Sequence, residues 1–231
     1  MKVCFNTFGC KTNQYDSALI GQALAAQGIE LAVGPEDADW VVVNTCAVTR
    51  RGEDKACQWV RRVGREHPRA RIAVVGCSVE VSAERFRNLP GVRLLLGTEE
   101  KFRLGEVLAG LPPEDKRLKN DGPELERSGE VLESTRYRGG ANAVFSETQA
   151  RARAFVKIQD GCNNRCTYCI VPRTRGPERS RDPGEIMQEA LTLENAGHHE
   201  VVLTGIHIGR YGVDRGECSG LTRLLERLLS G

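Results

Sequence analysis

The sequence has no long hydrophobic run, no N-terminal signal peptide and no large excess of charge of either sign. A membrane-spanning helix needs about 20 consecutive, mostly apolar residues, so we expect a soluble, cytoplasmic protein without a membrane partner. With 33 Lys and Arg residues against 31 Asp and Glu residues, the formal net charge is only +2. The global field is therefore weak, and binding to a polyanion would require a local basic patch.

The sequence also lacks a fourth cysteine close to its most informative motif, CNNRCTYC at residues 162–169. Clusters that only carry electrons usually take four cysteines, one for each iron. Structural zinc also takes four ligands, with the spacing of a finger or ribbon. The other candidate ligands lie downstream without such a spacing: His198, His199, His207 and Cys218.

Three thiolates at this spacing, Cys162, Cys166 and Cys169, can hold three irons of a four-iron cluster and leave the fourth iron open to a ligand. An alternative is that these positions mark one buried face of a helix, because i, i+4, i+7 is the helical period. Gly161 and Pro172 favour a loop or a very short helix. Nine cysteines without a secretory signal also indicate metal ligation rather than disulfides.

The first third of the sequence alternates short apolar runs with helical patterns, which is typical of an α/β fold with a parallel sheet and helices on its faces. The expected strands are residues 2–8, 40–44, 71–76 and 92–96. The expected helices are residues 15–27, 51–66 and about 99–108.

Residues 111–153 combine Pro and Gly pairs with mixed charge and few large apolar groups. We expect this segment to connect a first domain at 1–110 with a second at 154–231. The elements expected in the second domain are, in order, a strand at 155–159, the cysteine loop, a helix capped by Asp182, a strand at 200–204 and a helix after Ser219.

The last helix should present one apolar face, formed by Leu221, Leu224, Leu225 and Leu228. Two strand-helix units expose a parallel edge and cannot bury both faces of a sheet unaided. We therefore expect that the chain is a fragment, or that another segment completes the second domain.

A second set of cysteines follows the expected strands, because Cys10, Cys46 and Cys77 each come directly after one. The carboxyl ends of parallel strands lie at one edge of a sheet, where such sheets usually bind ligands. These thiols should converge there and hold a second cluster. The alternative is that they are small core residues, which is how we interpret Cys4 and Cys57.

Four segments together resemble the radical S-adenosylmethionine methylthiotransferases: residues 9–16 (GCKTNQYD), 44–49 (NTCAVT), 75–77 (VGC) and 161–169 (GCNNRCTYC). The resemblance spans nearly the whole chain and implies an N-terminal cluster domain followed by the first strand-helix units of a partial (β/α) barrel. The rest of that barrel and the small C-terminal RNA-binding domain usual in the family are missing from the sequence.

The resemblance implies two 4Fe-4S clusters, one on each cysteine set, and S-adenosylmethionine bound at the open iron of the Cys162 cluster. Tyr168, Thr204 and Gly205 lie where relatives bind this cofactor. One S-adenosylmethionine would methylate a sulfur on the N-terminal cluster, and a second would supply the radical that removes a hydrogen from the substrate. The implied partners are tRNA and an electron donor such as a flavodoxin or ferredoxin.

The substrate differs among branches of this family, which act on isopentenyladenosine in tRNA, threonylcarbamoyladenosine in tRNA, or an aspartate of a ribosomal protein. Residues 10–15, 155–160 and 203–209 look most like the threonylcarbamoyladenosine branch. The other two branches remain alternatives, as does a different class: a non-catalytic iron-sulfur or zinc module that binds RNA or carries electrons.

Four arginines follow the cysteine loop: Arg173, Arg175, Arg179 and Arg181. Guanidinium groups there could contact tRNA phosphates or a cofactor carboxylate. Alternatively, they form a solvated basic loop.

Overall fold

The computed structural model describes residues 1–111 and 153–230. Its N-terminal part is built on a five-stranded sheet in which all neighbouring strands are parallel, with the order β2-β1-β3-β4-β5. The strands are β1 (Lys2–Thr7), β2 (Glu30–Leu31), β3 (Trp40–Thr45), β4 (Arg71–Gly76) and β5 (Val92–Leu96). All six residues of β3 are buried, as expected for a central strand covered on both faces.

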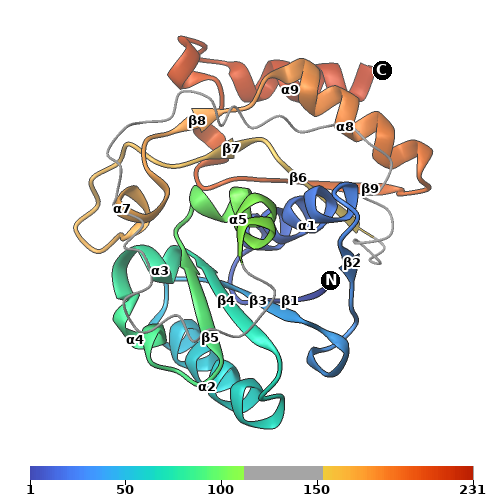
Figure 1. Cartoon of the computed structure of the whole chain (residues 1–231). Helices are drawn as coiled ribbons and strands as arrows, with labels where there is room; N and C mark the ends of the chain where they lie inside the picture. Colours follow the sequence, from blue (N-terminus) through green and yellow to red (C-terminus); the bar gives the residue numbers. More distant parts are fainter. Residues whose placement is uncertain (112–152, 231) are drawn as a thin grey trace.

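Helices cover both faces of this sheet (Figure 1). On one face, α1 (Lys11–Ala26) and α5 (Leu104–Gly110) pack against Val42 and Val75 through Leu24 and Leu104. On the other face lie α2 (Arg50–Glu66) and α4 (Glu84–Arg87). The remaining short helices are α3 (Cys77–Ser82), η1 (Pro35–Asp37) and η2 (Glu100–Arg103).

The second part contains a parallel pair of strands, β6 (Arg153–Lys157) and β9 (Glu200–Thr204). The helices α8 (Pro183–Asn195) and α9 (Gly220–Ser230) pack against it through Ile186, Leu193 and Leu224. The other elements are α7 (Val171–Arg175), the antiparallel pair β7 (Gln159–Asp160) and β8 (Arg179–Ser180), and the short helices η3 (Ile208–Arg210) and η4 (Val213–Arg215).

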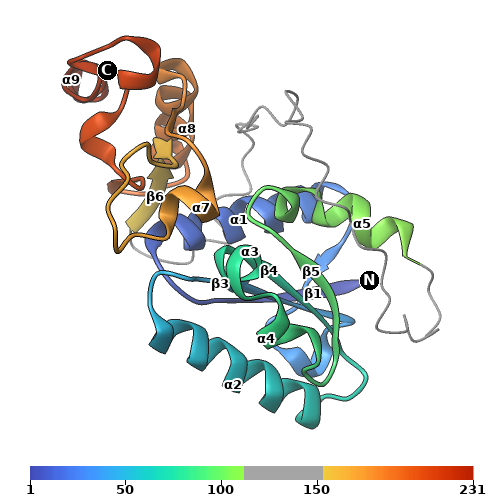
Figure 2. The same cartoon turned by 90° about the vertical axis from the view of Figure 1, so that its left-hand side faces the viewer.

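Helix α1 lies between the two sheets, as Figures 1 and 2 show. Its Ile20 and Leu24 belong to the core of the five-stranded sheet. Tyr15, on another face of the same helix, packs with Ala154 and Val156 of β6 in the second core. One helix therefore contributes to both hydrophobic cores, and the residues that begin it lie where the two parts of the chain meet.

Most expected elements are confirmed within a residue at each end, and α8 begins as expected, with the Asp182 carboxylate accepting hydrogen bonds from the N–H groups of Gly184 and Glu185. Four expectations need correction. The strand expected at 155–159 is β6 at Arg153–Lys157, and Gln159 already belongs to β7. Helix α1 begins at Lys11 rather than Tyr15. The helix expected at 99–108 is a 3-10 turn followed by α5. Leu225 is 41% exposed instead of sharing the buried face of α9.

Of the expected connector at 111–153, all residues except Leu111 and Arg153 lie outside the described residues, so the division into domains stays a prediction. Across the parts that the structure does describe, no helix has the length and apolarity needed to cross a membrane.

Candidate functional site

Three cysteines lie at the carboxyl edge of the five-stranded sheet. Cys10 precedes the first residue of α1, Cys46 follows the last residue of β3, and Cys77 is the first residue of α3, directly after β4. Because β1, β3 and β4 are neighbours and parallel, their ends bring these residues to one edge. Cys10 is exposed, whereas Cys46 and Cys77 are buried.

Close packing holds the loops that carry Cys10 and Cys46 against each other. Gly9 has a φ of +116°, and a Cβ atom there would lie 2.5 Å from the Cβ of Cys46. The side-chain amide of Asn13 donates hydrogen bonds to the carbonyl oxygens of Phe8 and Thr45, at 3.0 and 2.8 Å. Residue 9 must therefore be a glycine for the two loops to lie this close. The Asn13 side chain holds both loops in place through its two hydrogen bonds.

The electrostatics of this edge suit a metal cluster. Burial raises the pKa of the Cys46 thiol, the N–H of Val48 lowers it, and the thiolates of Cys10 and Cys77 raise it again. Because like charges repel, ionising all three neighbouring thiols costs free energy unless a cation lies between them. Thiolates are soft ligands that favour iron-sulfur clusters or zinc, so the donor set fits a cluster.

The second cysteine set lies on a loop, because residues 161–170 contain no helix and α7 begins only at Val171. The alternative of one buried helix face is therefore wrong. The Cys162 N–H donates to the Gly176 carbonyl at 3.1 Å, and the Cys169 N–H donates to the Cys166 carbonyl at 3.0 Å. Gly161 has a φ of +69°, and a Cβ atom there would lie 1.9 Å from the carbonyl oxygen of Pro177.

This loop is open to a ligand. Cys166 is exposed, Cys162 and Cys169 are half-buried, and the ring of Tyr168 is 90% exposed. Within residues 1–111 and 153–230, no three His, Cys, Asp or Glu side chains approach closely enough to share a single metal ion. A four-iron cluster distributes its cysteines over separate irons, so its ligands need not converge on one point.

The turn after β9 lies against the start of the cysteine loop. Thr204 is buried at the end of β9, and a Cβ atom at Gly205 would lie 2.9 Å from the Gln159 carbonyl oxygen. The Gln159 side chain accepts from the N–H groups of Ile206 and His207 at 3.0 and 2.9 Å and donates to the Gly161 carbonyl at 2.8 Å. Gln159 therefore ties the two segments together.

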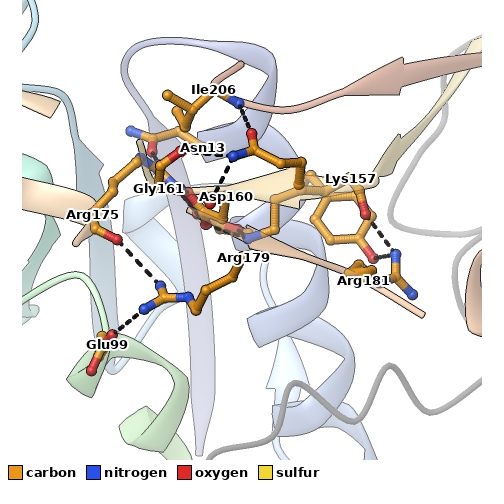
Figure 3. A network of polar contacts seen from close by, with 12 residues as sticks. Asn13, Glu99, Lys157, Asp160, Gly161, Arg175, Arg179, Arg181 and Ile206 are labelled. Atoms are coloured by element: carbon orange, nitrogen blue, oxygen red, sulfur yellow. Dashed lines mark hydrogen bonds and ion pairs between the residues drawn. The ribbon is translucent and has the colours of Figure 1, made fainter. Parts of the chain in front are cut away.

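A buried ion network joins the N-terminal part to the second part (Figure 3). The Asp16 carboxylate contacts the ammonium groups of Lys101 and Lys157 at 2.7 and 2.5 Å and the Arg175 guanidinium at 3.3 Å. Asp160 contacts Lys157 and Arg175, each at 2.9 Å. Burial alone would raise the pKa of Asp16, but the three cations lower it well below its usual value.

The four arginines after the cysteine loop separate into two groups. Arg175 and Arg181 are buried, and Arg181 pairs with Glu189 at 2.6 Å. Arg173 and Arg179 are exposed, and Arg179 pairs with Glu99 at 3.0 Å, as Figure 3 shows. The interpretation as a solvated loop is therefore wrong for Arg175 and Arg181. Their burial also prevents them from reaching tRNA phosphates.

Sequence reasoning missed the polar residues that organise the site: Asn13, Asp16, Lys101, Lys157, Gln159 and Asp160. A signal was present, because Asn13, Asp16 and Ser17 fall at i, i+3 and i+4, the spacing of one helix face. All three are buried. Polar residues on a buried face must find partners, so this pattern points to a polar contact with another segment.

Comparison with known proteins finds one family-model match in each of the two parts of the chain. Residues 2–97 match the family described as Uncharacterized protein family UPF0004. Residues 156–211 match the Radical SAM superfamily. The first range contains Cys10, Cys46 and Cys77, and the second contains the loop at 162–169.

Curated relatives match over nearly the whole chain. The Threonylcarbamoyladenosine tRNA methylthiotransferase MtaB of Bacillus subtilis (strain 168) is 37% identical over 92% of this chain and 45% of that protein. A tRNA-2-methylthio-N(6)-dimethylallyladenosine synthase of Pelotomaculum thermopropionicum is 35% identical over 96% of this chain and 48% of that protein. The Ribosomal protein uS12 methylthiotransferase RimO of Roseiflexus sp. (strain RS-1) is 35% identical over 99% of this chain and 50% of that protein. The chain spans about half the length of these relatives.

Proposed function

Because the chain belongs to the radical S-adenosylmethionine methylthiotransferase family, we propose that the protein is a tRNA-modifying enzyme that inserts a methylthio group at carbon 2 of N6-threonylcarbamoyladenosine, next to the anticodon. The observation that carries this proposal is the pairing of two cysteine triads. One triad lies at the sheet edge, the other lies on an open loop, and neither triad has a fourth cysteine beside it in the sequence.

The chemistry of the substrate favours a radical route. Carbon 2 of an adenine ring has no acidic hydrogen and no leaving group, so a general base cannot activate it at neutral pH. Two clusters and S-adenosylmethionine would supply the radical and the sulfur when bound. The residues of this chain would hold them: Cys162, Cys166 and Cys169 on the loop, and Cys10, Cys46 and Cys77 at the edge. Tyr168, Thr204 and Gly205 would bind S-adenosylmethionine.

A basic stripe on α2 supports a tRNA substrate. Four exposed cationic residues follow one side of this helix, at i, i+4, i+11 and i+14: Arg51, Lys55, Arg62 and Arg65. Of the helix's acidic residues, Glu53 is buried against Arg85, whereas the exposed Glu66 pairs with Arg62 at 3.9 Å. Helix α2 begins four residues after Cys46, so the stripe starts near the cysteine edge. We propose that this stripe contacts the phosphates of the tRNA.

The substrate branch rests on likeness to relatives of named activity. Two relatives named as threonylcarbamoyladenosine tRNA methylthiotransferases are 37 and 33% identical to this chain. Mass spectrometry of tRNA nucleosides from a gene-deletion strain tests this choice. We expect loss of the 2-methylthio form of threonylcarbamoyladenosine. Loss of the methylthio isopentenyladenosine form instead would assign the protein to the other tRNA branch, and unchanged tRNA would point to the ribosomal-protein branch.

Iron content tests the cluster assignment directly. After anaerobic reconstitution we expect about eight irons per chain, with matching acid-labile sulfide, falling to about four in the Cys162→Ala/Cys166→Ala/Cys169→Ala variant. About four irons in the wild type and none in the variant would mean that the sheet-edge triad holds no cluster, which would refute the proposed methylthio transfer.

A tRNA substrate also implies action in the cytoplasm, with an electron donor such as a flavodoxin or ferredoxin.

A further inference from the structure

Arg175 lies between the two cysteine triads. It is the last residue of α7, six residues after Cys169, and only 3% of it is exposed. Helix α7 packs against α3, whose first residue is Cys77, and the two helices lie side by side at the left of Figure 1. A buried arginine at this place can act on both triads.

On the N-terminal side, the guanidinium of Arg175 donates a hydrogen bond to the side-chain oxygen of Asn13. The amide nitrogen of the same Asn13 donates to the carbonyls of Phe8 and Thr45. Phe8 lies two residues before Cys10, and Thr45 directly precedes Cys46. Arg175 is therefore connected through one side chain to the loops that carry two of the three cysteines.

On the other side, Arg175 donates to both carboxylate oxygens of Asp160 at 2.9 Å. Asp160 in turn accepts a hydrogen bond from the N–H of Gly161 at 2.8 Å, directly before Cys162. Figure 3 shows Asn13, Arg175, Asp160 and Gly161 side by side. Asn13, Arg175 and Asp160 thus form a continuous polar bridge from one cysteine set to the other.

Arg175 brings a positive charge toward the sheet-edge triad. Its guanidinium pairs with the carboxylates of Asp16 and Asp160, at 3.3 and 2.9 Å. Burial lowers the pKa of Arg175, but Asp160, Asp16 and the thiolates of Cys77 and Cys10 raise it well above its usual value, so the guanidinium stays charged. A buried cation is costly unless anions lie next to it.

We propose that Arg175 is a positioning residue that fixes the two cysteine sets relative to each other through the polar bridge and places a positive charge beside the cluster of the sheet edge. The inference rests on the proposed function, because it assumes that Cys10, Cys46 and Cys77 hold iron. An anionic, thiolate-ligated cluster at the sheet edge would lie next to the positive charge of Arg175. A nearby cation favours the reduced, more negative form of such a cluster.

Hydrogen-deuterium exchange of the full chain tests the bridge, before and after reconstitution. In Arg175→Gln we expect faster exchange in both bridged segments, residues 8–13 with 45–46 and residues 160–176. Arg173→Gln, on the same helix but exposed, should change neither. Faster exchange in 160–176 alone would mean that Arg175 supports only its own loop, which would overturn the bridge. Because the metal-free chain also gives this readout, it does not depend on whether the clusters form.

The reduction potential tests the charge. In the Cys162→Ala/Cys166→Ala/Cys169→Ala background, where only the sheet-edge cluster would remain, we expect a more negative potential in Arg175→Gln and a potential near the parent's in Arg175→Lys and Arg173→Gln. An unchanged potential in Arg175→Gln would overturn the proposed electrostatic role. If Arg175→Gln binds no iron, Arg175→Lys becomes the test, because it keeps the positive charge. A reduction potential in Arg175→Lys that differs from the parent's would then overturn the electrostatic role. Absence of any cluster in the parent would instead refute the proposed function.

Discussion

Position in the fold, rather than burial alone, separates the cysteines that pack in the core from those that can bind a metal. Cys4, inside β1, is buried, and burial raises its pKa to about 11, with Glu36 adding to the rise. Burial also raises the pKa of Cys57 on α2. Both therefore remain protonated thiols in the hydrophobic core, as expected from the sequence. The six cysteines of the two triads lie instead at a sheet edge and on a loop, where a metal can reach them.

Removal of one cysteine should distinguish these two groups. We expect Cys10→Ala to lower the iron content of the reconstituted protein from about eight to about four, because a cluster at the sheet edge would lose one of three ligands. Cys57→Ala is the matched control and should leave iron unchanged. Iron and sulfide analysis measures both. Equal iron in the two variants would show that Cys10 is not a ligand.

At the scale of elements, local pattern predicted most strands and helices but not their polar contacts. Strands β4, β5 and β9 match the expected ranges, because each is a short apolar run between turn residues. The start of α1 was missed, since its first residues show no apolar period. Tertiary contacts decide that start: Asn13 and Asp16 are held by residues far along the chain.

The conformation of the cysteine loop depends on Gly161. The sequence indicates a turn at this glycine but not the close contact that it makes. Gly161 needs its positive φ, and a Cβ atom there would also collide with the Pro177 carbonyl. We expect Gly161→Ala to lose about four irons, those of the loop cluster, and to keep those of the sheet edge. Gly197→Ala is the control, because Gly197 also has a positive φ but no atom within 4 Å of its Cβ position. Iron analysis of both variants separates steric collision from backbone strain.

The basic stripe on α2 gives a prediction about RNA binding. Arg51→Glu/Lys55→Glu/Arg65→Glu should weaken tRNA binding and reduce the slope of log K against log salt by about one for each lost phosphate contact. A matched control reverses three exposed arginines elsewhere: Arg87→Glu/Arg103→Glu/Arg223→Glu. Filter binding at several salt concentrations measures the slope. Equal weakening in both triple variants would indicate a response to net charge alone.

In the molecule as a whole, one polar network joins segments that are far apart in sequence. Asp16 contacts Lys157 and Arg175, which lie 141 and 159 residues further along the chain. No local pattern specifies such pairs, which is why the sequence predicted the two cysteine sets and their loops but not the contacts between them. The same network ties α1 to β6 and α7, so it should contribute to the stability of the entire chain.

The pH dependence of stability should report this network. Burial would raise the pKa values of Asp16 and Asp160, but their cationic partners lower both. Groups with a lowered folded-state pKa stabilise the protein above their unfolded pKa, about 3.9 for Asp, and this contribution is lost as the pH falls below it. We therefore expect Asp16→Asn to lower the free energy of unfolding at pH 7 by about 3 kcal/mol, the cost of breaking a buried pair.

The same variant should lose less stability than the wild type between pH 5 and pH 3, because the asparagine side chain has no proton to gain. Urea midpoints across this range measure the difference. Asp54→Asn is the control: Arg85 also lowers the pKa of Asp54, but this pair lies at the surface, where ion pairs contribute little. If Asp16→Asn and Asp54→Asn had the same midpoints at every pH, the network would not be what holds the two parts of the chain together.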